Sequence, residues 1–330
     1  MPMNAPLSGS SLARVLVTGA NGFVGRALLA SGQSLGLRAA LRSAPSPELA
    51  VESVIVGDID AATDWTRALA GIDYVVHLAA RVHVMNPAAG DRLEYERTNV
   101  LATEHLARAA AAAGVRQFIY LSSIKVNGEM TADRAFRASD TPQPLDDYGR
   151  SKLEAERRLL RIDADSAMRV AIIRPPLVYG PGVRANFLRL LSLANWAVPL
   201  PLASVDNVRS LVSVWNLCDL ICSLLRRNEP ISGVYLVSDG VDISTPELLR
   251  RLARSMHRPA MLFPVPLKLL RTAASIAGKS AEFSRLCGSL AVDIRDTRTS
   301  LGWSPPVTLE QGLDWTARWY QNRPRPVNAP

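Results

Sequence analysis

Cysteine is scarce in this sequence of 330 residues, which has only Cys218, Cys222 and Cys287. An odd number without the paired spacing of zinc ligands excludes a disulfide framework and indicates no metal site. Cys218 and Cys222 stand one helical turn apart among leucine and isoleucine, a pattern typical of buried free thiols. The sequence therefore predicts a protein of a reducing compartment that holds no metal.

Long apolar runs are also missing. No window reaches the ~18 uninterrupted apolar residues of a membrane span, because charged residues interrupt every long Ala/Leu stretch. Residues 1–11 are rich in Pro, Ser, Gly and Asn and lack the basic and apolar regions of a signal peptide. We therefore expect a cytoplasmic protein without a membrane span.

Acidic residues are outnumbered, since 38 Lys and Arg stand against 30 Asp and Glu and give a net charge of +8. This surplus suits an anionic ligand, an anionic membrane surface or nucleic acid. The cations stand in ones and twos and never in a block of five or six, so we expect no nucleic-acid partner. With 48% hydrophobic and 21% charged residues, the composition is that of an ordinary folded protein.

The first half of the chain alternates β-branched runs with helical patterns. Residues 14–18 form the first expected strand, followed by a glycine-rich turn and a helix over 24–35. The other expected strands are 37–41, 53–56, 74–79, 118–121 and 170–173, and the other expected helices are 65–69, 99–113 and 148–161. This alternation predicts an α/β fold with a Rossmann-type, doubly wound parallel sheet.

After residue 175 Pro and Gly become more frequent, and the expected helices (185–195, 217–227, 246–254 and 309–320) are interrupted. We expect a dinucleotide-binding domain over 13–175 and a smaller C-terminal α/β lobe for the substrate over 176–322, with some segments returning to the sheet. Residues 1–12 are expected to form a disordered lead and 323–330 a frayed tail.

Residues 265–277 are a further helix candidate, apolar, flanked by prolines and carrying two cations. The stretch is short and its polar face is thin. We therefore favour packing against the lobe over an interfacial membrane helix.

The glycine-rich turn lies between the first strand and the first helix. Glycines in such a turn let the backbone approach a pyrophosphate, to which the helix offers N–H groups and a partial positive charge. The G-x-x-G-x-x-G spacing differs from G-x-G-x-x-G, but the strand-turn-helix context is the one this chemistry requires. The alternative is a purely structural turn. The residues expected to bind the dinucleotide here are Gly19, Asn21, Gly22, Phe23, Val24 and Gly25.

The end of the second strand identifies the nucleotide, because an acidic residue there suits a ribose 2′-OH and an Arg suits a 2′-phosphate. This chain has Arg42, and the nearest acid, Glu48, lies beyond two prolines. We therefore predict NADP(H) over NAD(H). If Arg42 is only a surface cation or stacks on the adenine, either cofactor would bind. Asp58 and Ile59 are placed for the adenine edge, although Asp58 suits a helix cap equally well.

Tyr148 and Lys152 stand four residues apart in a helical pattern and so share a face. The ammonium can lower the pKa of the phenol and hydrogen-bond a bound ribose, which makes Tyr148 a proton donor or acceptor. Ser123 ends the preceding strand, where its hydroxyl could meet the same substrate oxygen. A single Y-x-x-x-K pair is common by chance, so the catalytic site is indicated by this pair together with Ser123.

In these motifs the chain resembles the extended short-chain dehydrogenase/reductase family of nucleotide-sugar epimerases, dehydratases and reductases. The resemblance runs from Val15 to about Tyr320, with landmarks at 18–25, 58–59, 77–80, 99, 121–123, 148, 152, 174–175, 178–182 and 301–303. It implies that Ser123 positions the substrate oxygen, Tyr148 is the acid/base, and Lys152 binds ribose and tunes the tyrosine. It further implies that the cofactor is lined by Leu78, Ala79, Ala80, Asn99, Tyr148, Lys152 and Pro175.

The resemblance also implies a nucleoside diphosphate-sugar in the second lobe and a homodimer through the helices 99–113 and 148–161. Asn186 matches a segment that contacts the sugar nucleotide. Arg209 matches an arginine that meets the diphosphate, and Arg285 is a weaker match to a second one. For both arginines, a surface position in a basic protein is the alternative. His83 follows the fourth strand and faces either the cofactor or solvent.

Departures from the family pattern reduce the number of reactions that this chain is expected to catalyse. Ile124 and Lys125 replace the Asp-Glu pair that sugar dehydration needs, and Asn127 stands where galactose-type 4-epimerases usually have Tyr. The segments 121–129 and 174–182 resemble those of a subgroup of this family from bacterial O-antigen clusters. We expect reduction of a UDP-4-keto-6-deoxy-N-acetylhexosamine for polysaccharide precursors, with a UDP-sugar 4-epimerase as the second hypothesis. A non-catalytic dinucleotide sensor is a third, against which the Ser123, Tyr148 and Lys152 set argues.

Overall fold

The computed structural model describes residues 13–32, 34–45, 51–82 and 91–323. They form two compact units, each assembled from three segments of the chain. Unit 1 holds the described residues up to Leu121 together with 154–172 and 224–233, and unit 2 holds 122–153, 173–223 and the chain from Val234 on. The expected disordered lead, the tail beyond residue 323 and His83 lie outside the described residues.

A seven-stranded sheet has the strand order β3-β2-β1-β4-β5-β6-β9. Strands β3, β2, β1, β4 and β5 pair in parallel, and Thr18 at the end of β1 is level with Ala40 of β2 and His77 of β4. The β-branched and aliphatic side chains of β1 are fully buried, as expected for a sheet covered on both faces. The strands are β1 (Arg14–Thr18), β2 (Gly36–Leu41), β3 (Glu52–Ile55), β4 (Tyr74–His77), β5 (Gln117–Leu121), β6 (Arg169–Arg174) and β9 (Gly233–Leu236). The predicted Rossmann-type α/β fold is confirmed.

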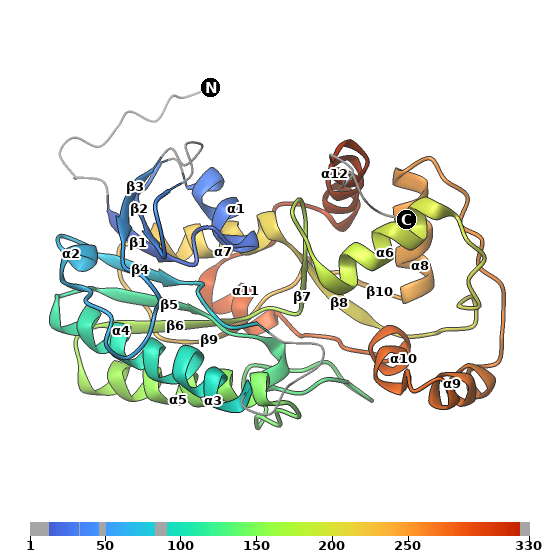
Figure 1. The fold of residues 1–330 in the computed structure, drawn as a ribbon, viewed down its shortest axis with the longest axis horizontal. Helices are drawn as coiled ribbons and strands as arrows, with labels where there is room; N and C mark the ends of the chain where they lie inside the picture. The colour runs from blue at the N-terminus through green and yellow to red at the C-terminus, as the bar shows by residue number, and fades with distance from the viewer. Residues whose placement is uncertain (1–12, 33, 46–50, 83–90, 324–330) are drawn as a thin grey trace. The chain divides into compact units, whose positions relative to one another are not determined.

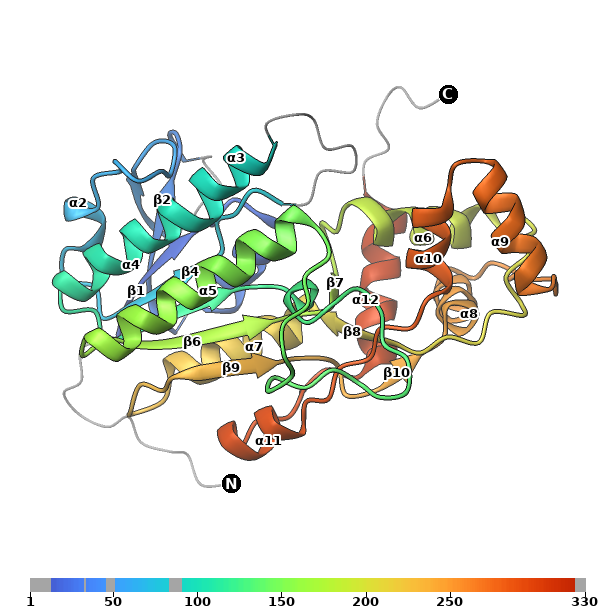
Figure 2. The ribbon, with the colours of Figure 1, turned by 90° about the horizontal axis from the view of Figure 1, so that it is seen from below.

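Helices of unit 1 lie on both faces of its strands, with α1 on one face and α4 and α5 on the other (Figure 1). The helices α4 and α5 lie side by side (Figure 2), and Arg158 of α5 forms an ion pair with Glu104 of α4. The helix α1 ends at Ser31 and not at residue 35, because Gly32 takes the C-cap position. The helices are α1 (Phe23–Ser31), α2 (Thr66–Leu69), α3 (Asp91–Tyr95), the π-helix η1 (Glu96–Leu101), α4 (Ala102–Ala112) and α5 (Asp147–Asp165).

Unit 2 contains a second sheet of three short strands in the order β10-β8-β7. Strand β8 pairs in parallel with β7 and antiparallel with β10. The sequence did not predict these three strands, of which β7 and β10, with three and two residues, are too short to show an alternating pattern. The elements are η2 (Ile124–Val126), β7 (Leu177–Tyr179), α6 (Ala185–Trp196), β8 (Arg209–Ser213), α7 (Val214–Leu225), β10 (Asp242–Ile243), α8 (Thr245–Ser255), α9 (Leu267–Ile276), α10 (Ser280–Cys287), α11 (Arg295–Leu301) and α12 (Leu309–Asn322).

The expectation that residues 265–277 pack against the lobe is wrong for most of this segment. No residue of α9 is buried, and Leu269 and Ile276 are 62% and 84% exposed. The apolar side chains of α9 point to two faces, and only the face with Leu270 and Ala274 is half-buried. Among the described residues no helix combines the length and the apolarity needed to cross a membrane.

A buried carboxylate connects several elements of unit 2. The Tyr179 hydroxyl donates to Asp239 Oδ2 over 2.7 Å, while Asp239 Oδ1 accepts from the Ser213 amide (2.8 Å) and from Asn216 Nδ2 (2.7 Å). Burial raises the pKa of the Asp239 carboxyl, and these hydrogen bonds oppose that rise. A Cβ on Gly312 would lie 2.4 Å from the Tyr179 hydroxyl, so only glycine lets α12 pass here.

We expect Tyr179→Phe to lower the free energy of unfolding by about 1–3 kcal/mol, because a buried carboxylate loses one of its donors. Urea unfolding measures the change. The control is Tyr320→Phe, which removes a hydroxyl that meets only the neutral Ser192 hydroxyl at 3.0 Å and is expected to cost about 1 kcal/mol or less. Equal losses in the two variants would contradict a special role for the carboxylate.

Candidate active site

The glycine-rich turn of unit 1 is too tight for any other residue at two of its positions. Gly19 has a φ of +68°, and a Cβ there would lie 2.6 Å from the backbone nitrogen of Ala79. A Cβ on Gly25 would lie 2.3 Å from the carbonyl oxygen of Gly19. The turn leads directly into α1, which begins with Phe23 and Val24 and whose N-cap, Gly22, makes no side-chain cap bond.

The place of this turn in the sheet fits a dinucleotide. Strand β1 lies between β2 and β4, so the chain order reverses beside it. Ligands of such sheets bind beyond the carboxyl ends of the strands at this reversal, with the phosphates at the helix N-terminus. The close backbone approach that Gly19 and Gly25 permit is what a pyrophosphate requires. The residues present therefore fit the expected cofactor.

The segment after β4 lies against the turn, as expected for Leu78, Ala79 and Ala80. The amide of Leu78 donates to the Thr18 carbonyl, and the amide of Ala79 to the Thr18 hydroxyl, both over 3.3 Å. Asn99 lies in the π-helix η1 and holds the next residue, Arg81, by accepting from its amide (2.8 Å) and donating to its carbonyl (3.0 Å). Asn99 therefore acts on this segment through Arg81.

Arg42 forms an ion pair with Asp58, a residue that was expected at the adenine edge or as a helix cap. Its Nε lies 2.6 Å from Oδ1 of Asp58, which comes just after β3 and just before Ile59. Both side chains are well exposed, so the ion pair itself adds little stability. It nevertheless places a carboxylate directly beside Arg42, the residue that was expected to hold a 2′-phosphate. Arg42 is therefore a poor phosphate site.

In unit 2, Ser123 and Tyr148 come from two elements that meet closely. Ser123 caps the short 3-10 helix η2, and its Oγ accepts from the Lys125 amide over 3.3 Å. Tyr148 lies in the first turn of α5, where a Cβ on Gly149 would be 3.0 Å from the Lys125 carbonyl. Lys152 follows one turn later, buried, with Nζ 5.9 Å from the centre of the Tyr148 ring. Pro175 accepts from the Ile124 amide over 3.0 Å.

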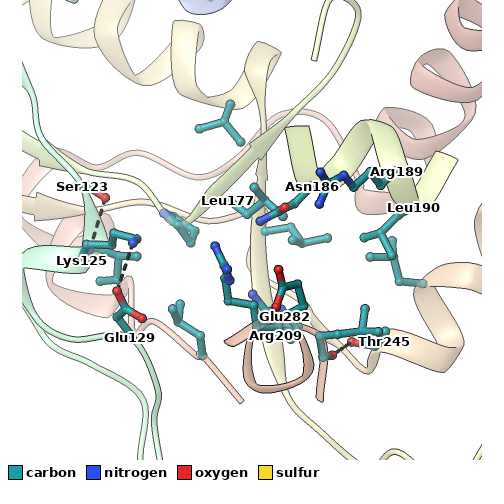
Figure 3. A pocket seen from close by; sticks show the side chains of 18 of the residues that line it. Ser123, Lys125, Glu129, Leu177, Asn186, Arg189, Leu190, Arg209, Thr245 and Glu282 are labelled. Carbon is teal, nitrogen blue, oxygen red and sulfur yellow. Dashed lines mark hydrogen bonds and ion pairs between the residues drawn. The ribbon is translucent and has the colours of Figure 1, made fainter. Parts of the chain in front are cut away.

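A cavity of about 410 Å³ lies within unit 2 and brings together all five predicted substrate residues. Ser123, Tyr148, Asn186, Arg209 and Arg285 all line it, whereas Lys152 and Pro175 do not belong to its lining. Figure 3 shows Ser123, Lys125 and Glu129 at one end and Asn186, Arg189 and Leu190 at the other. The volume is that of a pocket for a small organic ligand.

The middle of the cavity holds a cation without a counter-ion. Arg209 Nη1 donates to the carbonyls of Arg285 (2.8 Å) and Gly288 (3.0 Å), and no ion pair joins Arg209 to an acid in the described part of the chain. Burial lowers the pKa of its guanidinium, which reflects the cost of holding this charge away from water. An anionic ligand group would offset that cost.

The sequence reading missed Arg189, a third arginine in the lining. It follows Asn186 by three residues on α6, so the two share a helix face. The three-residue spacing from Asn186 was the signal in the sequence that could have identified Arg189. The alternative reading of Arg209 and Arg285 as plain surface arginines does not describe the structure, since both line the cavity.

Beside Ser123, three charged side chains form a cluster. Lys125 Nζ lies 3.0 Å from Glu129 Oε1 and 2.5 Å from Asp146 Oδ2. Asp146 Oδ1 also accepts from the Gly149 amide over 2.7 Å, which ties the cluster to the first turn of α5. We call Lys125, Glu129 and Asp146 the carboxylate cluster; with two acids and one base, its formal charge is −1.

Comparison with known proteins gives consistent matches. Residues 15–238 match the model of the NAD dependent epimerase/dehydratase family. The chain is 44% identical to a UDP-glucose 4-epimerase of Vibrio cholerae over 92% of this chain and 94% of that protein. It is 28% identical to the N-acetyl-alpha-D-glucosaminyl-diphospho-ditrans,octacis-undecaprenol 4-epimerase of Escherichia coli O157:H7, again over 92% and 94%. The structure of MoeE5 in complex with UDP-glucuronic acid and NAD superimposes with a TM-score of 0.75 at 27% identity, covering 94% of this chain and 99% of that one.

The expectation of NADP(H) over NAD(H) is wrong. MoeE5 is bound to NAD, both with UDP-glucuronic acid and with UDP-glucose. The physical reason lies in the ion pair of Arg42 with Asp58, because the Asp58 carboxylate would repel a 2′-phosphate. Nothing near Arg42 in the sequence shows this pairing, since Asp58 is 16 residues away.

Proposed function

The chain belongs to the NAD-dependent epimerase/dehydratase family, and we propose that it is a UDP-sugar 4-epimerase that works with NAD. The observation that carries the proposal is the cavity of unit 2. It has a hydroxyl and a phenol, Ser123 and Tyr148, in the same lining as the uncompensated Arg209. In this proposal the sugar lies at Ser123 and the diphosphate at Arg209.

The residues divide the work of the reaction. NAD, held at the glycine-rich turn, supplies the acceptor and then the donor of the C4 hydride. The Ser123 hydroxyl hydrogen-bonds O4 of the sugar and fixes its position. The Tyr148 oxygen takes the proton of the 4-hydroxyl when C4 is oxidised and returns it when the ketone is reduced on its other face. Lys152, one turn along α5, adds a positive charge near the phenol ring. No cofactor is consumed overall.

Two observations favour the epimerase over the reductase that the sequence alone favoured. The V. cholerae relative, at 44% identity, carries an epimerase name. Asn127, which counted against an epimerase, does not belong to the cavity lining. It is buried, accepts from Arg174 Nη1 and donates to the Arg137 carbonyl, both over 2.9 Å. Its identity therefore reflects packing and not the substrate.

The test compares four substrates with purified protein. UDP-N-acetylglucosamine and UDP-glucose are incubated alone, and NMR of the anomeric protons follows the C4 epimers. We expect conversion to an equilibrium mixture without change in reduced nicotinamide. Stoichiometric loss of NADH or NADPH with a UDP-4-keto-6-deoxy-N-acetylhexosamine would establish the reductase. If undecaprenyl-diphospho-N-acetylglucosamine were the one compound converted, the substrate would be this lipid-linked sugar and not a UDP-sugar.

The carboxylate cluster gives the proposed enzyme a preference for neutral sugars. A uronate would bring its C6 carboxylate toward a cluster of net charge −1. Repulsion of ~1.4 kcal/mol, about tenfold, follows for partly screened charges a few ångströms apart. We expect kcat/KM for UDP-glucuronate to be about tenfold below that for UDP-glucose. Glu129→Gln, which makes the cluster neutral, should remove most of this difference.

The matched control is Glu282→Gln, which removes another carboxylate from the same cavity lining. Glu282 lies apart from Ser123 and Glu129 in Figure 3, so this variant should leave the ratio of the two kcat/KM values unchanged. A wild-type enzyme that prefers UDP-glucuronate would mean that Lys125 attracts the uronate, contrary to this prediction.

We also propose a cytoplasmic homodimer that serves polysaccharide precursor synthesis. Leu101, the last residue of η1, and Leu160 on α5 are partly exposed, which suits a contact between subunits through these helices. Light scattering during size exclusion measures the mass, for which we expect twice 35.8 kDa.

A further inference from the structure

The helix α9 presents an apolar ridge that the proposed reaction does not use. Leu269, Ala273 and Ile276 follow one another at i, i+4 and i+7 and therefore share a face. All three are exposed. Leu270 and Ala274, each about 100° round the helix from the ridge residue before it, are half-buried, and α9 lies beside α10 (Figures 1 and 2). The ridge therefore points away from unit 2.

Further exposed apolar side chains lie on two neighbouring segments. The amide of Leu200 donates to the Met261 carbonyl (2.9 Å), and the amide of Phe263 donates to the Leu200 carbonyl (3.1 Å). These paired segments carry Trp196, Val198, Met261 and Phe263, all exposed, and Trp196 is 68% exposed. Phe263 leads through two prolines into α9. Large aromatic and aliphatic side chains are thus concentrated around this part of unit 2.

The charged side chains of α9 itself have a single sign. Lys268 lies on the flank of the ridge, while Arg271, three residues later, lies on the side of α9 away from the ridge. Residues 252–281 contain Arg254, Arg258, Lys268, Arg271 and Lys279 and not one Asp or Glu. Stretches without acids also occur elsewhere, since residues 166–205 hold four arginines and no Asp or Glu, so what distinguishes α9 is that its cations stand among exposed apolar side chains.

We propose that the face formed by the α9 ridge, together with the cations of α9, docks on an anionic membrane surface. A helix of this kind lies in the plane of the interface, with its apolar residues among the acyl chains and its cations at anionic headgroups. The partner is the bilayer surface itself, which α9 touches without crossing. Because α10 lies beside α9 and lines the cavity with Glu282, Arg285 and Leu286, docking would hold the cavity near the membrane.

The first test is cosedimentation of the full chain with vesicles. One set is phosphatidylcholine alone and the other contains phosphatidylglycerol, each at low and high salt. We expect binding to the anionic vesicles only, with loss of binding at high salt. Equal binding to both sets, or no binding to either, would overturn the proposal.

Variants then locate the surface. Lys268→Gln/Arg271→Gln should weaken binding to anionic vesicles at least tenfold, and Leu269→Ser/Ile276→Ser should do the same. Arg157→Gln/Arg161→Gln on α5 removes the same charge, and Ile55→Ser/Val241→Ser removes two other exposed apolar side chains; both controls should bind like the wild type. If the α9 variants also bind like the wild type, the proposal fails. If they convert a larger oligomer to a smaller one, a second copy of the chain covers the ridge instead.

None of these residues lines the cavity, so every variant should keep its activity toward a UDP-sugar in solution. That activity shows that the variants are folded. The inference is independent of the proposed reaction, because vesicle binding by a protein that failed to epimerise UDP-sugars would leave it intact.

Discussion

Tyr148→Phe is expected to lower kcat for C4 epimerisation about 10³-fold while leaving the affinity for UDP unchanged. In the proposed reaction the Tyr148 phenol, which lines the cavity, exchanges a proton with O4, and general acid–base catalysis contributes about 10²–10⁴-fold. Phenylalanine preserves the shape of the cavity, and the anion site at Arg209 is untouched. Steady-state rates give kcat, and calorimetric titration with UDP gives the affinity.

The control for the lost hydroxyl is Tyr320→Phe. The Tyr320 hydroxyl bonds Ser192 and does not belong to the cavity lining, so this variant should keep the wild-type kcat. A Tyr148→Phe enzyme within tenfold of the wild type would show that another group moves the proton. Loss of UDP affinity together with kcat would instead indicate damage to the cavity.

Gly19→Ala is expected to weaken NAD binding at least 100-fold. Alanine must adopt a φ of +68° there, and its Cβ would lie 2.6–2.9 Å from backbone atoms of Leu78 and Ala79. Backbone cannot move aside as a flexible side chain can, so the turn must open and its amides must leave the pyrophosphate. Calorimetric titration of the purified protein with NAD measures the affinity.

Gly114→Ala separates the steric effect from backbone strain. Gly114 has a φ of +80°, but a Cβ there meets no atom within 4 Å. This variant carries only the left-handed strain of about 1–2 kcal/mol, which should appear as lost stability with normal NAD affinity. If Gly19→Ala retained its affinity, the turn would not be the pyrophosphate site.

The parts of the site that the sequence predicted are those set by local chemistry. A strand-turn-helix connection of this kind needs a positive φ that glycine adopts without strain, and the structure has the turn as expected. Tyr148 and Lys152 at four-residue spacing lie on one helix, as their spacing requires. The parallel sheet followed from alternating strands and helices, because short connections permit few other arrangements.

The parts that could not be predicted depend on partners distant in the sequence. Arg42 has the local pattern of a phosphate ligand, and only the fold brings Asp58 to it. The cluster of Lys125 and Asp146 joins residues 21 positions apart. The face on which α9 packs depends on α10, and a helix with apolar residues on two faces does not reveal which one is covered.

The assembly of each unit from separated segments has a consequence for biosynthesis. Unit 1 is complete once Gly233 has been made, whereas unit 2 also needs the chain beyond it. Residues 122–153 and 173–223 must therefore wait, already synthesised but without the rest of unit 2, while the ribosome adds the C-terminal part. Chains emerge at about 5–20 residues per second, so this interval lasts several seconds. The nascent enzyme is most exposed to aggregation and to chaperones in that interval, and the cavity is among the last features of the molecule to form.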